Sequence, residues 1–297
     1  MKKTTVLAFS VMLLIATMTF GQEYTFKVLL NKGKNEIKSG NTWQPIRVGA
    51  ELRPDDVVKI AENAYLGLVH ATGKPLDVKE SGQYTVANLS ARVGKGSGVL
   101  NKYAEFILST TGQKNKLSAT AAVHRGPDKI DVHLPQNSAY IFGDTIAISW
   151  EEDESIPGPY LVILTNLWGD ELMKVETEAN SVLINLRDKV LANTNDVQVE
   201  VFSTKVNKKS DQVVLRKFAK GDSDRVGAEY KQLVSEIGDN SILSKLYKAA
   251  FFEEKKLLVD AATALRQAIE LGPDLPSLWE DYESFLLRNG LKPLPKK

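Results

Sequence analysis

The pattern of apolar residues changes lastingly near Phe218 in this 297-residue chain, and that change constrains the fold more than any other feature. Up to about Phe218, apart from a helical stretch at 97–108, apolar and polar residues alternate in short segments, the period-two pattern of half-buried β-strands. From Ser223 onward, apolar residues recur every three or four positions, which is helical spacing. A chain of this length exceeds the roughly 100 to 150 residues of a usual domain. The sequence therefore predicts a multidomain α+β fold with a small β-domain, a β-sandwich and C-terminal α-helical hairpins.

The first predicted domain, residues 22–110, combines short strands with a closing helix. Turn-forming residues separate the expected strands, which are 24–30, 43–48, 57–60, 65–70, 76–78 and 84–86. Residues 97–108 carry apolar side chains at helical spacing, with Ser97 as a cap. Residues 111–128 are polar and lack periodicity, so we expect a linker there.

The order of residues within this domain resembles that of the FecR-like envelope domain. The resemblance rests on turn and core positions, namely Trp43, Pro45, Ile46, Val48, Gly49, Leu52, Asp55, Asp56, Val57, Val58, Ala64, Tyr65, Leu66, Leu68, Gly73, Gly82 and Tyr84. It implies an extracytoplasmic β-domain used for sensing or binding. The sequence shows neither the cytoplasmic segment nor the membrane helix of the family's signal-transducing members, so iron-dependent transcriptional signalling is not implied.

The second predicted domain, residues 129–221, has the pattern of a β-sandwich. Its expected strands are 130–134, 145–150, 160–164, 172–176, 181–186, 197–202 and 213–218. Residues 146–150, 158–163 and 180–186 resemble strands of a fibronectin type III or immunoglobulin-like domain, which usually serves as a spacer or a binding surface. Sandwiches regularly bury a tryptophan, so Trp150 is expected in the core rather than on a ligand-binding surface.

Residues 222–297 are expected to form helices. One helix follows Ser223, and two more are predicted at 241–254 and 257–271. The residues that resemble a tetratricopeptide repeat are Ala261, Leu265, Ala268, Pro273, Pro276, Trp279, Tyr282 and Leu286. About three repeats are needed to bury a continuous core, so this segment should dock on the sandwich or on a partner. A plain helical hairpin that closes the fold is the alternative.

The N-terminus has the features of a secretory signal peptide, assigned to residues 1–21. Lys2 and Lys3 precede the apolar run 6–20, and the small residue Gly21 stands at the expected cleavage site. The run is shorter than the roughly 20 residues of a membrane span, although an uncleaved anchor is the alternative. The chain has no cysteine, which excludes disulfides and a cysteine-linked lipid. We expect a periplasmic or secreted bacterial protein with no transmembrane segment after signal cleavage.

The sequence shows no catalytic, cofactor or metal motif. His124 and His133 are nine positions apart, which is not a metal-ligand spacing, and the segment 94–98 lacks the glycine of a phosphate loop. The acidic run 151–154 lacks the spacing of a calcium loop and is expected to be a solvated turn. The formal net charge of +1 and the scattered basic residues give no reason to expect nucleic acid binding. We therefore expect neither an enzyme nor a bound cofactor.

Two functional hypotheses remain. In the first, the protein is a non-enzymatic envelope protein that mediates protein–protein interaction or scaffolding, with other envelope proteins as partners. In the second, it is a carbohydrate or cell-wall binding module that uses exposed aromatic side chains on glycan or peptidoglycan. The candidate partner-binding residues are Trp168, Trp279 and Tyr282. Trp168 lies in 166–170, a predicted hairpin turn, where exposure is expected.

Overall fold

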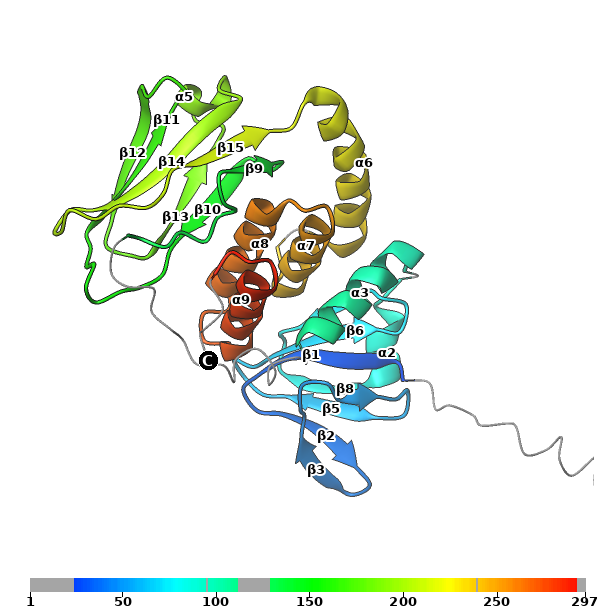
Figure 1. The fold of residues 1–297 in the computed structure, drawn as a ribbon. Coiled ribbons are helices and arrows are strands. Elements are labelled where there is room, and N and C mark those ends of the chain that lie inside the picture. Colours follow the sequence, from blue (N-terminus) through cyan, green and yellow to red (C-terminus); the bar gives the residue numbers. More distant parts are fainter. Residues whose placement is uncertain (1–23, 95, 112–128, 239, 293–297) are drawn as a thin grey trace, which may run out of the picture.

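The computed structural model describes residues 24–94, 96–111, 129–238 and 240–292. The predicted signal peptide and residues 112–128 of the predicted linker lie outside the described residues. The described chain forms two β-rich parts with a group of helices between them (Figure 1). This is the multidomain α+β fold that the change in apolar periodicity predicts.

The N-terminal β-rich part contains two antiparallel sheets that enclose one core. The sheets have the orders β4-β1-β6-β7 and β3-β2-β5-β8. The strands are β1 Phe26–Lys32, β2 Asn35–Ser39, β3 Thr42–Pro45, β4 Glu51–Leu52, β5 Val57–Ile60, β6 Tyr65–His70, β7 Pro75–Val78 and β8 Gly82–Thr85. Alternate side chains point inward, so Phe26, Val58 and Leu66 are fully buried between the sheets. The alternating segments of the sequence correspond to this antiparallel architecture.

Two helices follow β8. Thr85 caps α2, Val86–Ala91, because its hydroxyl accepts a hydrogen bond from the N–H of Asn88. The strand predicted at 84–86 therefore ends one residue early, and the short helix after it was not predicted. The next helix, α3, spans Gly98–Thr111 and agrees with the helix predicted at 97–108.

The second β-rich part is a sandwich of a five-stranded sheet, β12-β11-β14-β15-β9, and a two-stranded sheet, β10-β13. The elements are β9 Ser138–Ile141, β10 Thr145–Ser149, β11 Tyr160–Thr165, β12 Glu171–Thr177, β13 Ser181–Asn185, α5 Lys189–Ala192, β14 Asp196–Ser203 and β15 Val213–Lys217. Side chains of both sheets meet in one core that includes Ile148, Val162 and Ile184. Trp150 is fully buried in this core, as predicted.

Two parts of the strand prediction for the sandwich are wrong. Residues 130–134 form no strand, only isolated bridges from Ile130 to Ser210 and from Val132 to Trp150. Strand β9 was not predicted, because it has few residues and its partner is β15, far along the chain, to which it runs parallel. Both differences arise because pairing between distant segments decides which residues form strands, and the alternation of apolar and polar residues along the sequence contains no information about such pairing.

Four helices complete the fold: α6 Lys220–Ile237, α7 Ile242–Glu254, α8 Leu258–Leu271 and α9 Pro276–Arg288. Ser241 and Ser244 form a capping box at the start of α7, and Pro276 opens α9 at a position where its missing N–H costs nothing. Helices α7 and α8 agree closely with the helices predicted at 241–254 and 257–271, and α9 contains the repeat-like residues Pro276, Trp279, Tyr282 and Leu286. The first, α6, starts three residues before Ser223.

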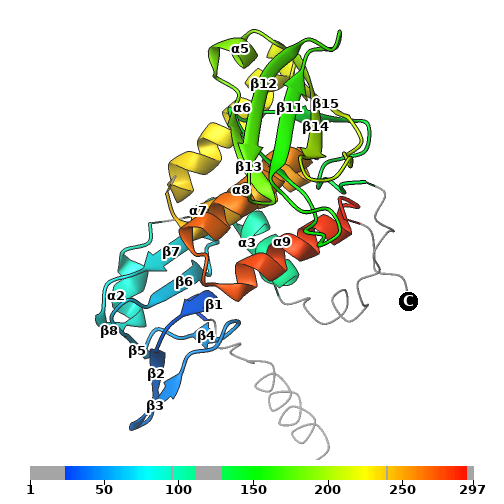
Figure 2. The same ribbon diagram turned by 90° about the vertical axis from the view of Figure 1, so that its left-hand side faces the viewer.

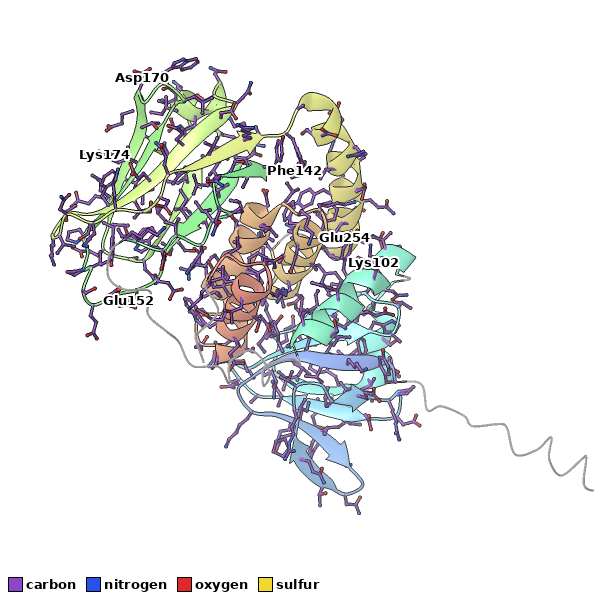
Figure 3. The ribbon with its side chains drawn as sticks, viewed as in Figure 1. Lys102, Phe142, Glu152, Asp170, Lys174 and Glu254 are labelled. Atoms are coloured by element: carbon purple, nitrogen blue, oxygen red, sulfur yellow. The ribbon has the colours of Figure 1, made fainter. Side chains whose placement is uncertain are left out.

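Helices α7, α8 and α9 lie between the two β-rich parts (Figure 2). One apolar cluster joins Leu30 and Tyr65 of the first part to Leu243 and Phe251 of α7. The hydroxyl of Tyr247 donates a 2.6 Å hydrogen bond to the carbonyl oxygen of Gly73. Lys102 of α3 and Glu254 of α7 form an ion pair of 2.8 Å (Figure 3). The helices therefore dock on the β-domain as well as on the sandwich.

Candidate functional site

The turn between β11 and β12 presents an exposed tryptophan on an ordered backbone. Trp168 is 86% exposed. The side-chain oxygen of Asn166 accepts hydrogen bonds from the N–H groups of Trp168 and Asp170, both at 2.9 Å. The amide of Asn166 donates to the Asp170 carboxylate at 2.8 Å. Gly169 has a φ of 89°, which a glycine adopts without strain. The backbone that carries the indole is thus fixed by local contacts.

Other apolar side chains are exposed at the same end of the sandwich. Leu167 is 47% exposed beside Trp168, and Val190 of α5 is 50% exposed. The helix α5 contacts β12 and lies at the end where the β11–β12 turn is found (Figure 1). Figure 3 labels Asp170 at this end, away from α7, α8 and α9. This surface is therefore free of the internal contacts that hold the helices.

The three candidate partner-binding residues do not lie together. Trp279, on α9, is 41% exposed, and the guanidinium of Arg266 lies over its ring at 5.0 Å from the centroid. Tyr282 is only 3% exposed, and its hydroxyl lies 2.6 Å from the hydroxyl of Ser149. Tyr282 therefore belongs to the contact between α9 and the sandwich, where a partner does not reach it. Trp168 is the candidate with the greatest accessible area.

Polar side chains of α8 fasten the helices to the sandwich. The carboxylate of Asp260, which is 3% exposed, accepts hydrogen bonds from the N–H groups of Phe142 at 3.0 Å and Gly143 at 2.6 Å. The hydroxyl of Thr263 accepts a 2.8 Å hydrogen bond from the N–H of Ala147. Burial raises the pKa of Asp260 to about 6, against the opposing effect of the two backbone donors.

A second polar group joins α9 to the sandwich through His133. Its Nε2 lies 2.6 Å from Glu151 Oε1, and its Nδ1 lies 3.2 Å from Ser149 Oγ. Lys292 pairs with the same Glu151 oxygen at 2.9 Å. Burial alone would raise the pKa of Glu151, but the hydrogen bonds from His133 and Lys292 lower it to about 2.

Serine, histidine and glutamate are also the residue types of a hydrolytic triad, but their arrangement in this group differs from that of a triad. A nucleophilic serine must reach a substrate carbonyl, and Ser149 is only 5% exposed. Its hydroxyl already shares a hydrogen bond with Tyr282. The ring also presents Nδ1 to the serine, whereas in the serine-protease triad Nε2 takes the proton. The arrangement favours an internal structural contact.

Sequence reasoning missed the role of Glu151, which was expected in a solvated turn. Its carboxylate instead contacts His133 of the sandwich and Lys292 beyond α9. No local pattern signals this contact, because the partners lie 18 and 141 positions away. The one available signal was that Glu151 directly follows the buried Trp150.

Among the described residues, no three His, Cys, Asp or Glu side chains are placed to hold a metal ion. No helix among the same residues combines the length and apolar composition needed to cross a membrane.

No protein-family model and no curated protein matches the chain. Among solved structures it is similar to PorZ, an essential bacterial surface component of the type-IX secretion system of Porphyromonas gingivalis, with 13% identity and a TM-score of 0.23 over 61% of this chain and 24% of PorZ. It is also similar to the central fibronectin-III array of RIM-binding protein, with 10% identity and a TM-score of 0.19 over 63% of this chain and 54% of the array. The chain thus spans only part of each structure, and TM-scores this low carry no argument about function.

Proposed function

We propose that this chain is a non-enzymatic bacterial envelope protein, exported to the periplasm or beyond, that binds another envelope protein through the Trp168 turn. The observation that supports the proposal most is the 86% exposure of Trp168 on a turn held by Asn166. Tryptophan is among the residues that contribute most to binding energy at protein interfaces. An ordered turn also loses little conformational freedom on binding, so more of the contact energy becomes affinity.

The rest of the chain is proposed to act as a scaffold that holds this turn. We infer that residues 22–110 form a FecR-like domain and that residues 222–297 are a tetratricopeptide-like segment that packs against both β-rich parts. The full burial of Ala261 and Ala268 on one helix supports the second assignment, because small residues allow paired helices to approach. The export proposal rests on residues 1–21 alone.

The proposal is tested by crosslinking in intact cells, followed by purification of the chain and mass spectrometry. We compare Trp168→Ala with Leu271→Ala, because Leu271 is also an exposed apolar residue, at 50%, but lies on α8. A protein captured by the wild type and by Leu271→Ala, and lost with Trp168→Ala, supports the proposal. Equal capture by all three proteins contradicts it.

The same exposed indole also suits the alternative function, since sugar rings stack on aromatic faces. Sedimentation of the purified protein with isolated cell wall separates the two functions. If Trp168→Ala abolishes sedimentation and no protein is captured in cells, the glycan-binding function replaces the first. A turnover screen with peptidoglycan and peptide substrates tests the non-enzymatic part of the proposal, and any turnover that survives purification contradicts it.

A further inference from the structure

Within the part of the chain that the structure describes, strand β13 is paired with a strand on one side only. In the two-stranded sheet its neighbour is β10, with a regular register from Thr145 opposite Asn185 to Ser149 opposite Ser181. The other edge of β10 is covered, because Thr263 accepts from the N–H of Ala147 there. The helices therefore close one edge of this sheet and leave the edge at β13 without a strand.

The backbone groups of Leu183 point to that open edge. The N–H of Leu186 donates to the carbonyl oxygen of Asp144 at 2.7 Å, so residue 186 faces β10. Because successive residues of a strand alternate in direction, Ile184 also faces β10 and Leu183 faces the opposite way. No backbone partner of Leu183 is found among the described residues. One donor and one acceptor are thus available to an added strand.

Three other edge strands, β3, β7 and β12, carry protection that β13 lacks, whereas β8 and β9 resemble β13 in having no charge or proline. The edge strand β12 contains Glu171, Lys174 and Glu176, and its pairing with β11 has a bulge (Figure 3 labels Lys174). Strands β3 and β7 contain Pro45 and Pro75. Charges, bulges and prolines are the features that keep a second chain from pairing with an edge. The sequence of β13 is Ser-Val-Leu-Ile-Asn, with no charge, proline or bulge.

A cation lies beside this edge. The guanidinium of Arg266 donates to Ser181 Oγ at 2.6 Å and lies over the rings of Trp279 and Tyr282. Its contacts among the described residues are with the Ser181 hydroxyl and these two rings, and none of them is an ion pair with a carboxylate. Leu183 and Trp279, each 41% exposed, provide apolar area nearby. A ligand that completes this surface needs an extended backbone, an apolar side chain and a carboxylate.

We propose that the open edge of β13 binds an extended segment of a partner protein as an added strand, and that an acidic residue of this segment pairs with Arg266. Backbone hydrogen bonds to Leu183 provide affinity, and the contact with Arg266 provides selectivity for a carboxylate. This surface is separate from the Trp168 turn. Thr165 and Glu171 flank the Trp168 turn and pair at one end of the β11–β12 hairpin. Thr177 lies at the other end of this hairpin, four residues before Ser181, which Arg266 contacts.

The test selects ligands for the whole chain from a phage-displayed library of random twelve-residue peptides. Fluorescence anisotropy then measures the affinity of synthetic copies of the selected peptides. We expect an alternating apolar pattern with Asp or Glu. Leu183→Pro should weaken binding by about tenfold or more, because proline removes the N–H that faces the edge and leaves the hydrogen bonds to β10 intact. Failure to enrich any peptide, or binding by Leu183→Pro within about twofold of the wild type, overturns the proposal.

Three controls assign the effect to this surface. Arg266→Gln should weaken binding of the acidic peptide by about tenfold. It should leave unchanged the affinity for a peptide in which Asn or Gln replaces the Asp or Glu. Trp168→Ala should not change the affinity for the selected peptide. A failure of the β13 proposal can therefore be distinguished from a failure of the proposed function at the Trp168 turn. Hydrogen exchange on the wild type gives a readout that needs no variant. The peptide should slow exchange of the Leu183 amide at least about tenfold, and an amide already protected without peptide contradicts the open edge.

Discussion

Asp260 joins α8 to the sandwich through two backbone hydrogen bonds. Asp260→Ala leaves the N–H groups of Phe142 and Gly143 without their acceptor. A fully buried donor without a partner costs about 1–3 kcal/mol, and these two hydrogen bonds are only part-buried, so we expect the free energy of unfolding to fall by about 2–4 kcal/mol rather than by the full sum. Urea denaturation of the whole chain measures it.

The matched control for this experiment is Asp222→Ala, at the start of α6, where the carboxylate is exposed and, among the described residues, forms an ion pair only with exposed Arg225. Exposed substitutions of this kind usually change stability by less than about 0.5 kcal/mol. A loss of the same size in both variants would contradict the role assigned to Asp260.

Glu151 makes the free energy of unfolding depend on pH in the acidic range. Its pKa is lowered from 4.5 to about 2 in the folded protein, so between these values the unfolded chain binds more protons than the native one. The contribution of Glu151 is therefore present above pH 4.5 and is lost as the pH falls toward 2. We expect the difference in unfolding free energy between the wild type and Glu151→Gln to shrink over that interval. Urea titrations at several pH values measure it, and a constant difference would contradict the ion-paired state.

At the scale of elements, the turn between β11 and β12 depends on Asn166. Asn166→Ala removes the acceptor for two backbone N–H groups, so we expect a stability loss of about 1 kcal/mol and lower NMR order parameters at residues 167–169. Asn180→Ala is the matched control, because the side chain of Asn180 in the β12–β13 turn makes no hydrogen bond within the described residues. Unchanged order parameters in Asn166→Ala would show that the turn is not held this way.

Elements with a strong local pattern could be predicted from the sequence, and elements defined by distant pairing could not. Strands β5 and β6 match their predicted bounds, because each is a short, mostly apolar run between turn-forming residues. Strand β2 was missed because Ile37 is its one apolar residue, and its place is set by pairing with β3 and β5. Of the candidate site, exposure of Trp168 followed from turn chemistry, whereas burial of Tyr282 depended on a contact 133 positions away.

At the scale of the whole molecule, α7, α8 and α9 join the two β-rich parts into one unit. The same helical group contacts the β-domain through Tyr247 and the sandwich through Asp260 and Thr263. These contacts hold the Trp168 turn at a fixed position relative to the N-terminal domain. The described contacts thus join the two β-rich parts through the chain's own residues.

The distance between the two β-rich parts tests this claim most directly. The chain has no cysteine, so Glu62→Cys and Glu178→Cys provide two exposed spin-label positions, one in each part. Double electron–electron resonance should give one narrow distance distribution, and Asp260→Ala in the same background should broaden it. A broad or multiple distribution in the doubly labelled protein without Asp260→Ala would contradict the claim that the helices hold both parts in one rigid arrangement.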